Sequence, residues 1–370
     1  MELIIERDKL LRPLQMVSGA VERRQTLPIL SNVLLSIQDN KISTTATDLE
    51  IELISNTVLN DPAIESGEVT VPARKLIDIC RALPSDTKIK LKFKEGGRRL
   101  TVHANDSKFA LSTLPVSEFP NVEESRFGTA ECVLPQNQLK TLIEKTYFAM
   151  AQQDVRYFLN GILLELNQGV IRFVATDGHR LATAFLTDDS IKQEQNLQVI
   201  IPRKGVMELM RLLKDTEDKA QILIGSNHIC VKTDELIFTS KLIEGKFPNY
   251  NVVIPKNGDK EVIVDRNQFK KALARVSILS NETYRGIRIN LASNSMHLST
   301  NNPEQEEAEE KIVIDYAHPD LEIGFNVNYF LDICNTSTAD ELKLIFSDSD
   351  GGILIEEANN ITYVVMPMRI

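Results

Sequence analysis

The side chains best suited to chemistry stand together in Asp177-Gly178-His179-Arg180. A carboxylate, an imidazole and a guanidinium could serve as an acid, a base and an oxyanion-binding group. However, Asp177 has counterparts at Asp48 and Asn302 in repeated segments, which favours a turn after a strand. The sequence has no serine or cysteine in a nucleophile-elbow pattern, no phosphate loop and no paired metal-ligand motif. It therefore favours a non-catalytic protein and predicts no cofactor and no metal.

The length and composition narrow the class of protein further. The chain has 370 residues, enough for two or three domains. Apolar residues make up 42% of the chain and charged residues 25%, a composition that excludes a wholly disordered chain. It has no apolar run of about 18 residues, so we expect no membrane partner, and its first seven residues look like a strand, not a signal peptide. The scattered cysteines indicate a reducing cytosol and argue against a zinc site or disulfides. They are Cys80, Cys132, Cys230 and Cys334.

The chain repeats itself with a period of about 125 residues. Thr45-Ala-Thr-Asp48, Val174-Ala-Thr-Asp177 and Ser299-Thr-Asn-Asn302 each follow an alternating apolar stretch. A second set is interleaved with the first, and in it Val71-Pro-Ala-Arg-Lys75 corresponds to Ile201-Pro-Arg-Lys204. We therefore expect each unit to contain two halves, and each half to consist of a strand, a helix and three strands. Duplication for stability alone would explain such a repeat, but the strict order of elements favours a symmetric surface.

Each repeat is large enough to be a domain. Turn-rich polar stretches near residues 121–130 and 250–260 separate the repeats. We therefore expect three similar α+β domains, at residues 1–125, 129–253 and 254–370.

Charge is distributed unevenly between the predicted elements. The whole chain carries a net charge of −10, which taken alone argues against binding to nucleic acid. Six segments with helical apolar spacing nevertheless hold 15 basic and 5 acidic residues, which leaves 27 basic and 47 acidic residues elsewhere. These segments are residues 7–19, 74–83, 138–151, 203–214, 267–280 and 328–336.

A basic helical face of this kind would attract a polyanion. For any single helix a solvated surface is the simpler explanation, but five of the six segments share one sign. The sequence has no tryptophan and no helix-turn-helix or zinc-finger spacing, so base stacking or base reading is not expected. The predicted contact is with backbone phosphate and independent of base sequence.

Motifs from one end of the chain to the other resemble the bacterial sliding clamp family, the beta subunits of DNA polymerase III. The motifs that carry this resemblance cover all three repeats. They are Thr26-Leu-Pro-Ile-Leu, Ala46-Thr-Asp-Leu-Glu, Val71-Pro-Ala-Arg-Lys, Gln153-Asp-Val-Arg-Tyr, Ala175-Thr-Asp-Gly-His-Arg-Leu, Ile201-Pro-Arg-Lys-Gly, Asn302-Pro-Glu-Gln-Glu-Glu-Ala-Glu-Glu and Tyr363-Val-Val-Met-Pro-Met-Arg.

The resemblance implies a ring-shaped processivity factor that is not an enzyme. Its fold would be three similar clamp domains, each with two helices inside and antiparallel sheets outside, in a head-to-tail homodimer that encircles double-stranded DNA. It would tether the replicative DNA polymerase and act at the nucleoid in the cytoplasm. The DNA-facing positions of the family correspond to Arg24, Arg74, Gln153, Tyr157, Arg203 and Lys204. A neighbouring aromatic is Phe158 here, which lacks a hydroxyl and is left out of this set.

The resemblance also implies a contact between two different surfaces of each chain. On the first domain the matching positions are Lys75, Phe109 and Leu111, with Arg98 and Lys108 as candidate cations. On the third domain they are Ile278, Leu279, Glu304, Glu306, Glu307, Glu309 and Glu310. From composition alone this acidic run would be a solvated turn.

A peptide groove is the third implied site. It would dock the polymerase catalytic subunit, the clamp loader complex, translesion polymerases, mismatch repair proteins and ligase through short linear motifs. The matching positions are Leu159, Thr176, Gly178, His179, Arg180, Leu181, Pro248, Val253, Val364, Met366, Pro367, Met368 and Arg369. Adaptable methionines and apolar walls suit such a pocket. The family pattern is broken at Val252, which replaces a basic residue, and near Gly352, which replaces a serine.

One alternative stays open on the residues alone. An acidic protein–protein adaptor that binds no nucleic acid would explain the net charge and the methionine-rich end of the chain. It would not explain the basic helices.

Overall fold

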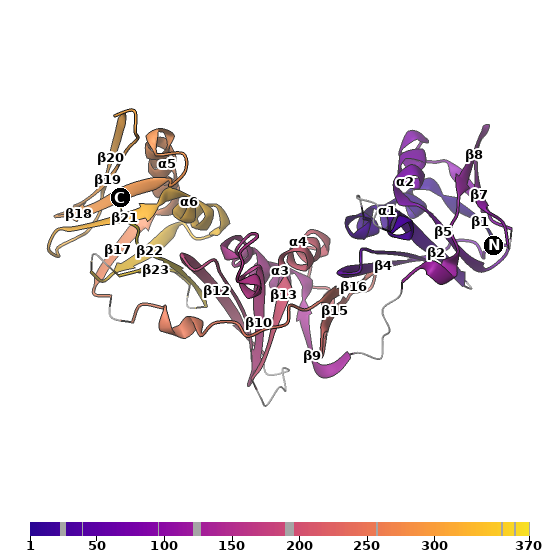
Figure 1. Cartoon of the computed structure of the whole chain (residues 1–370), viewed down its shortest axis with the longest axis horizontal. Coiled ribbons are helices and arrows are strands. Elements are labelled where there is room, and N and C mark those ends of the chain that lie inside the picture. Colours follow the sequence, from indigo (N-terminus) through magenta and orange to yellow (C-terminus); the bar gives the residue numbers. More distant parts are fainter. Residues whose placement is uncertain are drawn as a thin grey trace. The chain divides into compact units, whose positions relative to one another are not determined.

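The computed structural model describes residues 1–22, 27–38, 40–94, 96–120, 127–188, 196–256, 258–348, 351–358 and 360–369. Within these residues the chain forms six α-helices and 24 strands (Figure 1). None of the described helices is long and apolar enough to cross a membrane.

The order of elements is the same three times. The first repeat runs β1 (Glu2–Glu6), α1 (Arg7–Val17), β2 (Asn32–Gln38), β3 (Lys41–Thr47), β4 (Ile51–Val58), β5 (Gly67–Pro72), α2 (Ala73–Ala82), β6 (Lys88–Lys92), β7 (Arg99–Ala104) and β8 (Ser107–Ser112). The second runs β9 (Phe127–Pro135), α3 (Gln136–Glu144), β10 (Gly161–Asn167), β11 (Val170–Thr176), β12 (Arg180–Thr187), β13 (Leu197–Pro202), α4 (Arg203–Leu212), β14 (Lys219–Gly225), β15 (His228–Lys232) and β16 (Leu236–Lys241). The third runs β17 (Lys260–Asp265), α5 (Arg266–Val276), β18 (Gly286–Ala292), β19 (Ser295–Asn301), β20 (Glu307–Val313), β21 (Leu321–Asn326), α6 (Val327–Thr336), β22 (Glu341–Phe346), β23 (Ile353–Ala358) and β24 (Ile361–Val365). The predicted order of strand, helix and three strands in each half is therefore confirmed.

The strands form four sheets. Two sheets have four strands, in the orders β1-β6-β7-β8 and β20-β19-β18-β21. The other two have eight strands, in the orders β5-β2-β3-β4-β16-β15-β14-β9 and β13-β10-β11-β12-β24-β23-β22-β17. Each eight-stranded sheet joins two consecutive repeats through one antiparallel pair, β4 with β16 or β12 with β24.

The described chain forms two compact bodies, and each contains one of these joints. One comprises Met1–Asn137 with Met207–Leu242, and the other comprises Gln138–Val206 with Ile243–Ile370. The central repeat contributes to both, because β10 to β13 share a sheet with the third repeat, whereas β9 and β14 to β16 share a sheet with the first.

Helical periodicity predicted the helices well because each one buries a single apolar stripe. In α1 the buried face contains Leu10, Leu14 and Val17, and α1 packs on β3, β4 and α2. Two predicted helices are clearly shorter than expected, since α3 ends at Glu144 and not near residue 151, and α5 ends at Val276 and not near residue 280. Just after α3, the Thr146 hydroxyl donates to the carbonyls of Leu142 and Ile143 and competes with the helical backbone for these acceptors.

A buried ion pair fixes the joint between β12 and β24. The side chains of Lys145, just after α3, and Glu357, on β23, are 5% and 4% exposed. Lys145 Nζ also donates to the Thr336 carbonyl at 3.0 Å, and Glu357 accepts from the Tyr363 hydroxyl and the Thr338 N–H, both at 2.9 Å. All the charges are therefore compensated within the protein, the arrangement in which a buried pair is tolerated.

Burial alone would raise the pKa of Glu357, but the hydrogen bonds from Lys145 Nζ and the Thr338 N–H outweigh it and lower the pKa below 4.5. Because the pKa is lower in the folded state than in the unfolded state, the ionised carboxylate stabilises the fold at neutral pH. This stabilisation is lost as the pH falls below about 4.5.

Glu357→Gln should lower the free energy of unfolding by about 3–5 kcal/mol, because it leaves the Lys145 ammonium buried without a counter-charge. The measurement is urea-induced unfolding at neutral pH. Glu261→Gln is the control, since it breaks the more exposed Lys343–Glu261 pair and should cost less than about 1 kcal/mol. Equal, small losses in both variants would contradict the assignment.

Candidate functional site

A cavity of about 290 Å³ lies where β12 meets β24. Leu181 on β12 stands directly opposite Val364 on β24, and the N–H of Met366 donates to the His179 carbonyl at 2.8 Å. Leu159, Leu181 and Val364 are at most 3% exposed and belong to the apolar core beneath the cavity. The floor of the site is therefore built by strand register across two repeats.

The side wall is held rigidly by Arg180. Its guanidinium pairs with Asp332 at 2.5 Å and with Asp177 at 3.1 Å, and it also donates to the Phe148 carbonyl. It stacks over the rings of Phe148 and Tyr329. Because its hydrogen-bonding capacity is largely used, Arg180 shapes the cavity more than it offers free donors.

The opposite wall comes from the loop around the 3-10 helix Tyr250–Val252. Tyr250 is 6% exposed, and its hydroxyl donates to Glu165 at 2.8 Å. Burial, helped by that carboxylate, raises the pKa of Tyr250 to about 12, so its hydroxyl stays protonated at neutral pH. Val253, 44% exposed, stands at the rim and offers an apolar surface to an incoming ligand.

Nine of the thirteen groove residues predicted from the sequence line this one cavity. They are Leu159, Thr176, Gly178, Arg180, Leu181, Pro248, Val253, Val364 and Met366. His179, Pro367, Met368 and Arg369 do not line it, and the Met368 N–H is engaged with the Gly324 carbonyl of β21. A role for these four residues at the rim stays a prediction.

Four lining residues were missed, namely Arg156, Phe158, Asn249 and Tyr250. Two of them had a sequence signal, because Asn249 and Tyr250 directly follow the Phe247-Pro248 pair at the end of the second repeat. Phe158 lines the cavity next to Leu159, so its ring contributes here although it lacks a hydroxyl.

The turn that closes the cavity occurs twice in the chain. The Thr176 hydroxyl accepts from the Gly178 N–H, and Asp177 Oδ1 accepts from the N–H groups of His179 and Arg180. The same bonds recur at Thr47 and Asp48, where Leu49 takes the place of Gly178. Both residues have positive φ, +92° at Gly178 and +74° at Leu49. The carboxylate of Asp177 is thus a turn-forming group, as the sequence predicted, and not a catalytic acid.

The predicted DNA-facing residues lie on loops and at helix starts. Arg24 lies outside the described residues. Arg74 and Lys204 are exposed in the first turns of α2 and α4, and Arg203 is half-buried beside Lys204. Gln153 has φ +56° in an exposed loop that also carries Tyr157, 57% exposed. The Asn160 amide holds this loop by bonds to the N–H and the carbonyl of Asp154.

The predicted dimer contacts lie mainly on the edge strands β8 and β20 and on the 3-10 turn after α5, with Lys75 on α2, Arg98 just before β7, and Glu304 and Glu306 just before β20. Lys75, Arg98 and Lys108 are exposed on the first repeat, where Phe109 is half-buried and Leu111 is only 7% exposed. Ile278 is 75% exposed and Leu279 is half-buried in the 3-10 turn after α5. The glutamates are exposed except Glu310, which pairs with Arg275 at 2.5 Å within its own chain; the others are Glu304, Glu306, Glu307 and Glu309.

In the described part of the chain, no cluster of three or more His, Cys, Asp or Glu side chains is placed to hold a metal ion. Repeated antiparallel units that share sheets, with an apolar groove at a joint, are typical of a non-catalytic clamp.

Comparison with known proteins gives the same class. Models of the N-terminal, central and C-terminal domains of the DNA polymerase III beta subunit match residues 1–123, 133–249 and 251–369. The chain is 54% identical to the beta sliding clamp of Pseudomonas putida and 46% identical to that of Escherichia coli, over the full length of each protein. It is also similar to two crystal structures of the Pseudomonas aeruginosa clamp. One contains a ligand and the other griselimycin, and they show 50% and 51% identity, a TM-score of 0.96 and full coverage of both chains.

The chain therefore belongs to the DNA polymerase III beta subunit family, the bacterial sliding clamps. It functions in DNA replication as a non-catalytic sliding clamp that docks partner proteins.

Gly178→Leu should close the groove without disturbing the fold. A side chain at Gly178 would meet the Arg156 guanidinium at 3.0 Å, whereas Leu49 demonstrates that the same turn accepts leucine. Loss of one apolar anchor site should lower the affinity for a short peptide containing glutamine and leucine by about 10- to 100-fold. The measurement is fluorescence anisotropy with a labelled peptide.

Leu49→Gly is the matched control, because it makes the reverse change at the equivalent turn and should leave peptide affinity unchanged. A well-folded Gly178→Leu protein with unchanged affinity would show that ligands enter elsewhere.

Proposed function

We propose that the chain closes head to tail with a second copy into a ring, with domains at residues 1–125, 129–253 and 254–370. The support is a pairing rule within the chain. The last strand of the first half of one repeat pairs with the last strand of the second half of the next, as β4 does with β16 and β12 with β24. By this rule β20 requires a strand equivalent to β8, and both are edge strands of four-stranded sheets.

The two edges suit one another in charge and apolarity. An open edge presents unpaired backbone groups, which favours pairing with another chain. Lys108 on β8 is exposed, and β20 carries Glu307 and Glu309 exposed on its surface. Ile278 stands beside this edge as an apolar anchor, which Phe109 on β8 would cover in the second copy. Because the surfaces differ, the contact is heterologous and forms a closed ring only if the rotation closes.

Changing both Ile278 and Leu279 to alanine should convert the dimer to a folded monomer. Each lost apolar side chain removes about 1.5–3 kcal/mol of burial where it is fully covered, and the change acts at both contacts of the ring. Sedimentation velocity at low micromolar concentration measures the result. Ile263→Ala, an exposed isoleucine on β17, is the control and should leave the dimer intact. A double variant that still sediments as a dimer would place the interface elsewhere.

We propose that the starts of α2 and α4 and the loop around Gln153 contact DNA phosphates. The residues are Arg74, Gln153, Tyr157, Arg203 and Lys204, and the family resemblance adds Arg24. Cations in the first turn of a helix oppose its dipole, at a cost of about 0.3–1 kcal/mol each. Arg74 and Lys75 on α2 and Arg203 and Lys204 on α4 nevertheless occupy such positions, and neither helix has an acidic residue there. An external anion at the helix ends would offset that cost.

Retention of the loaded ring should depend on the topology of the DNA. The proposed contact is with phosphate alone, so the attraction is independent of base sequence and weakens as salt is added. At moderate salt the protein should stay on nicked circular DNA and be lost after linearisation with a restriction enzyme, as followed by gel filtration. Equal retention on both DNA forms would exclude topological linkage.

We propose that the groove docks the replicative polymerase, the clamp loader, translesion polymerases, mismatch repair proteins and ligase through short linear motifs. The support is its apolar floor and its flexible thioether at Met366, which adapt to several ligands. The proposed place of action is the replisome in the cytoplasm.

A further inference from the structure

Not every cation on the basic helices is available to a polyanion. Glu235, in the turn before β16, accepts from Arg12 of α1 at 2.7 Å and from Lys214, just after α4, at 2.9 Å. Arg211 on α4 pairs with Glu208 at 2.8 Å. By contrast, Arg74 and Arg81 on α2 have no acidic partner among the described residues.

The place of Glu235 is fixed by the sheet. Its backbone carbonyl accepts from the Asn56 N–H at 3.2 Å and from the Ser55 hydroxyl at 3.3 Å, both on β4. Glu235 therefore sits at the joint between β4 and β16, where one carboxylate reaches cations from two helices. Hydrogen bonding from Lys214 is the main cause that lowers its pKa, so the carboxylate is ionised at neutral pH.

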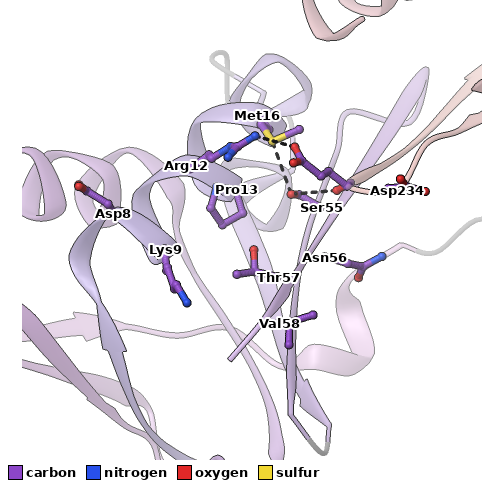
Figure 2. Close-up of a pocket in the computed structure, with 11 residues that line it drawn as sticks. Asp8, Lys9, Arg12, Pro13, Met16, Ser55, Asn56, Thr57, Val58 and Asp234 are labelled. Atoms are coloured by element: carbon purple, nitrogen blue, oxygen red, sulfur yellow. Dashed lines mark hydrogen bonds and ion pairs between the residues drawn. The ribbon is translucent and has the colours of Figure 1, made fainter. Parts of the chain in front are cut away.

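Arg12 and Glu235 both line an open cavity of about 450 Å³ between α1 and β4. Figure 2 shows Arg12, Pro13 and Met16 from α1 on one side of it and Ser55, Thr57 and Val58 from β4 on the other. The side chains of Arg12, Lys214 and Glu235 are 63%, 39% and 38% exposed. All three groups are thus within reach of solvent and of a ligand in solution.

We propose that Glu235 restrains the DNA affinity of the clamp by holding Arg12 and Lys214 away from phosphate. This proposal rests on the proposed contact between the helices and DNA. Exposed ion pairs contribute little to stability, so a structural reason for converging two cations on one carboxylate is weak. Each cation that a phosphate must first take from Glu235 contributes less to binding and releases fewer counterions.

The test is equilibrium binding to a labelled linear duplex between about 50 and 200 mM salt, measured by fluorescence anisotropy. Glu235→Gln keeps the shape and removes the charge. It should bind more tightly than wild type, and the slope of log affinity against log salt should steepen by about 0.9 for each cation released. For each cation released, the gain in affinity over wild type should therefore be about 3-fold larger at 50 mM salt than at 200 mM salt.

Glu322→Gln, at an exposed carboxylate on β21, is the matched control because it changes the net charge equally. Glu235→Asp should keep the wild-type slope, and adding Arg12→Gln to Glu235→Gln should remove one released cation and flatten the slope again. A purely structural role would lower the melting temperature of Glu235→Gln without changing the slope.

The outcomes separate this proposal from the one beneath it. If wild type binds DNA and Glu235→Gln has the same slope as Glu322→Gln, or binds more weakly, then Glu235 does not restrain affinity. If wild type fails to bind at low salt, the proposed helical DNA contact itself is wrong.

Discussion

Edge-to-edge pairing of strands from consecutive repeats is the interaction on which the other features of this chain depend. The pair β12–β24 places Leu181 opposite Val364 and so creates the floor of the groove. The pair β4–β16 places Glu235 next to Ser55 and so brings its carboxylate to the cations of two helices. Neither site belongs to a single repeat, because each is assembled by a joint.

The repeats then differ by single side chains on a common backbone. Residues 47–51 and 176–180 form the same hydrogen-bonded turn, but Leu49 accepts a positive φ that ordinarily favours glycine. In the third repeat, Asn302 Oδ1 accepts from the N–H of Glu306, one residue further along than at Asp48. Such substitutions change the side chains at equivalent turns while the turn itself is kept.

The elements and the helical faces could be predicted from the sequence, because burial of one apolar stripe imposes the period of 3.6. The strand partners could not, since β12 and β24 are separated by more than one repeat, and periodicity gives no information on which edges meet. Some groove residues were missed for the same reason. Phe158 and Tyr250 reach the cavity only through tertiary packing, although resemblance had located Leu159 and Val253 beside them.

Charge was the least predictable property, because counting residues treats every cation alike. Lys145 is buried in an ion pair, Arg7 donates to the Cys80 carbonyl at the end of α2, and Arg12 is held by Glu235. If the basic helices face DNA as proposed, they attract it through their positive charge but offer fewer direct phosphate ligands than their composition indicates. This separation would suit the proposed ring, which must remain on DNA and still move, because the field acts over about a Debye length while short, fixed contacts would hold the ring in place.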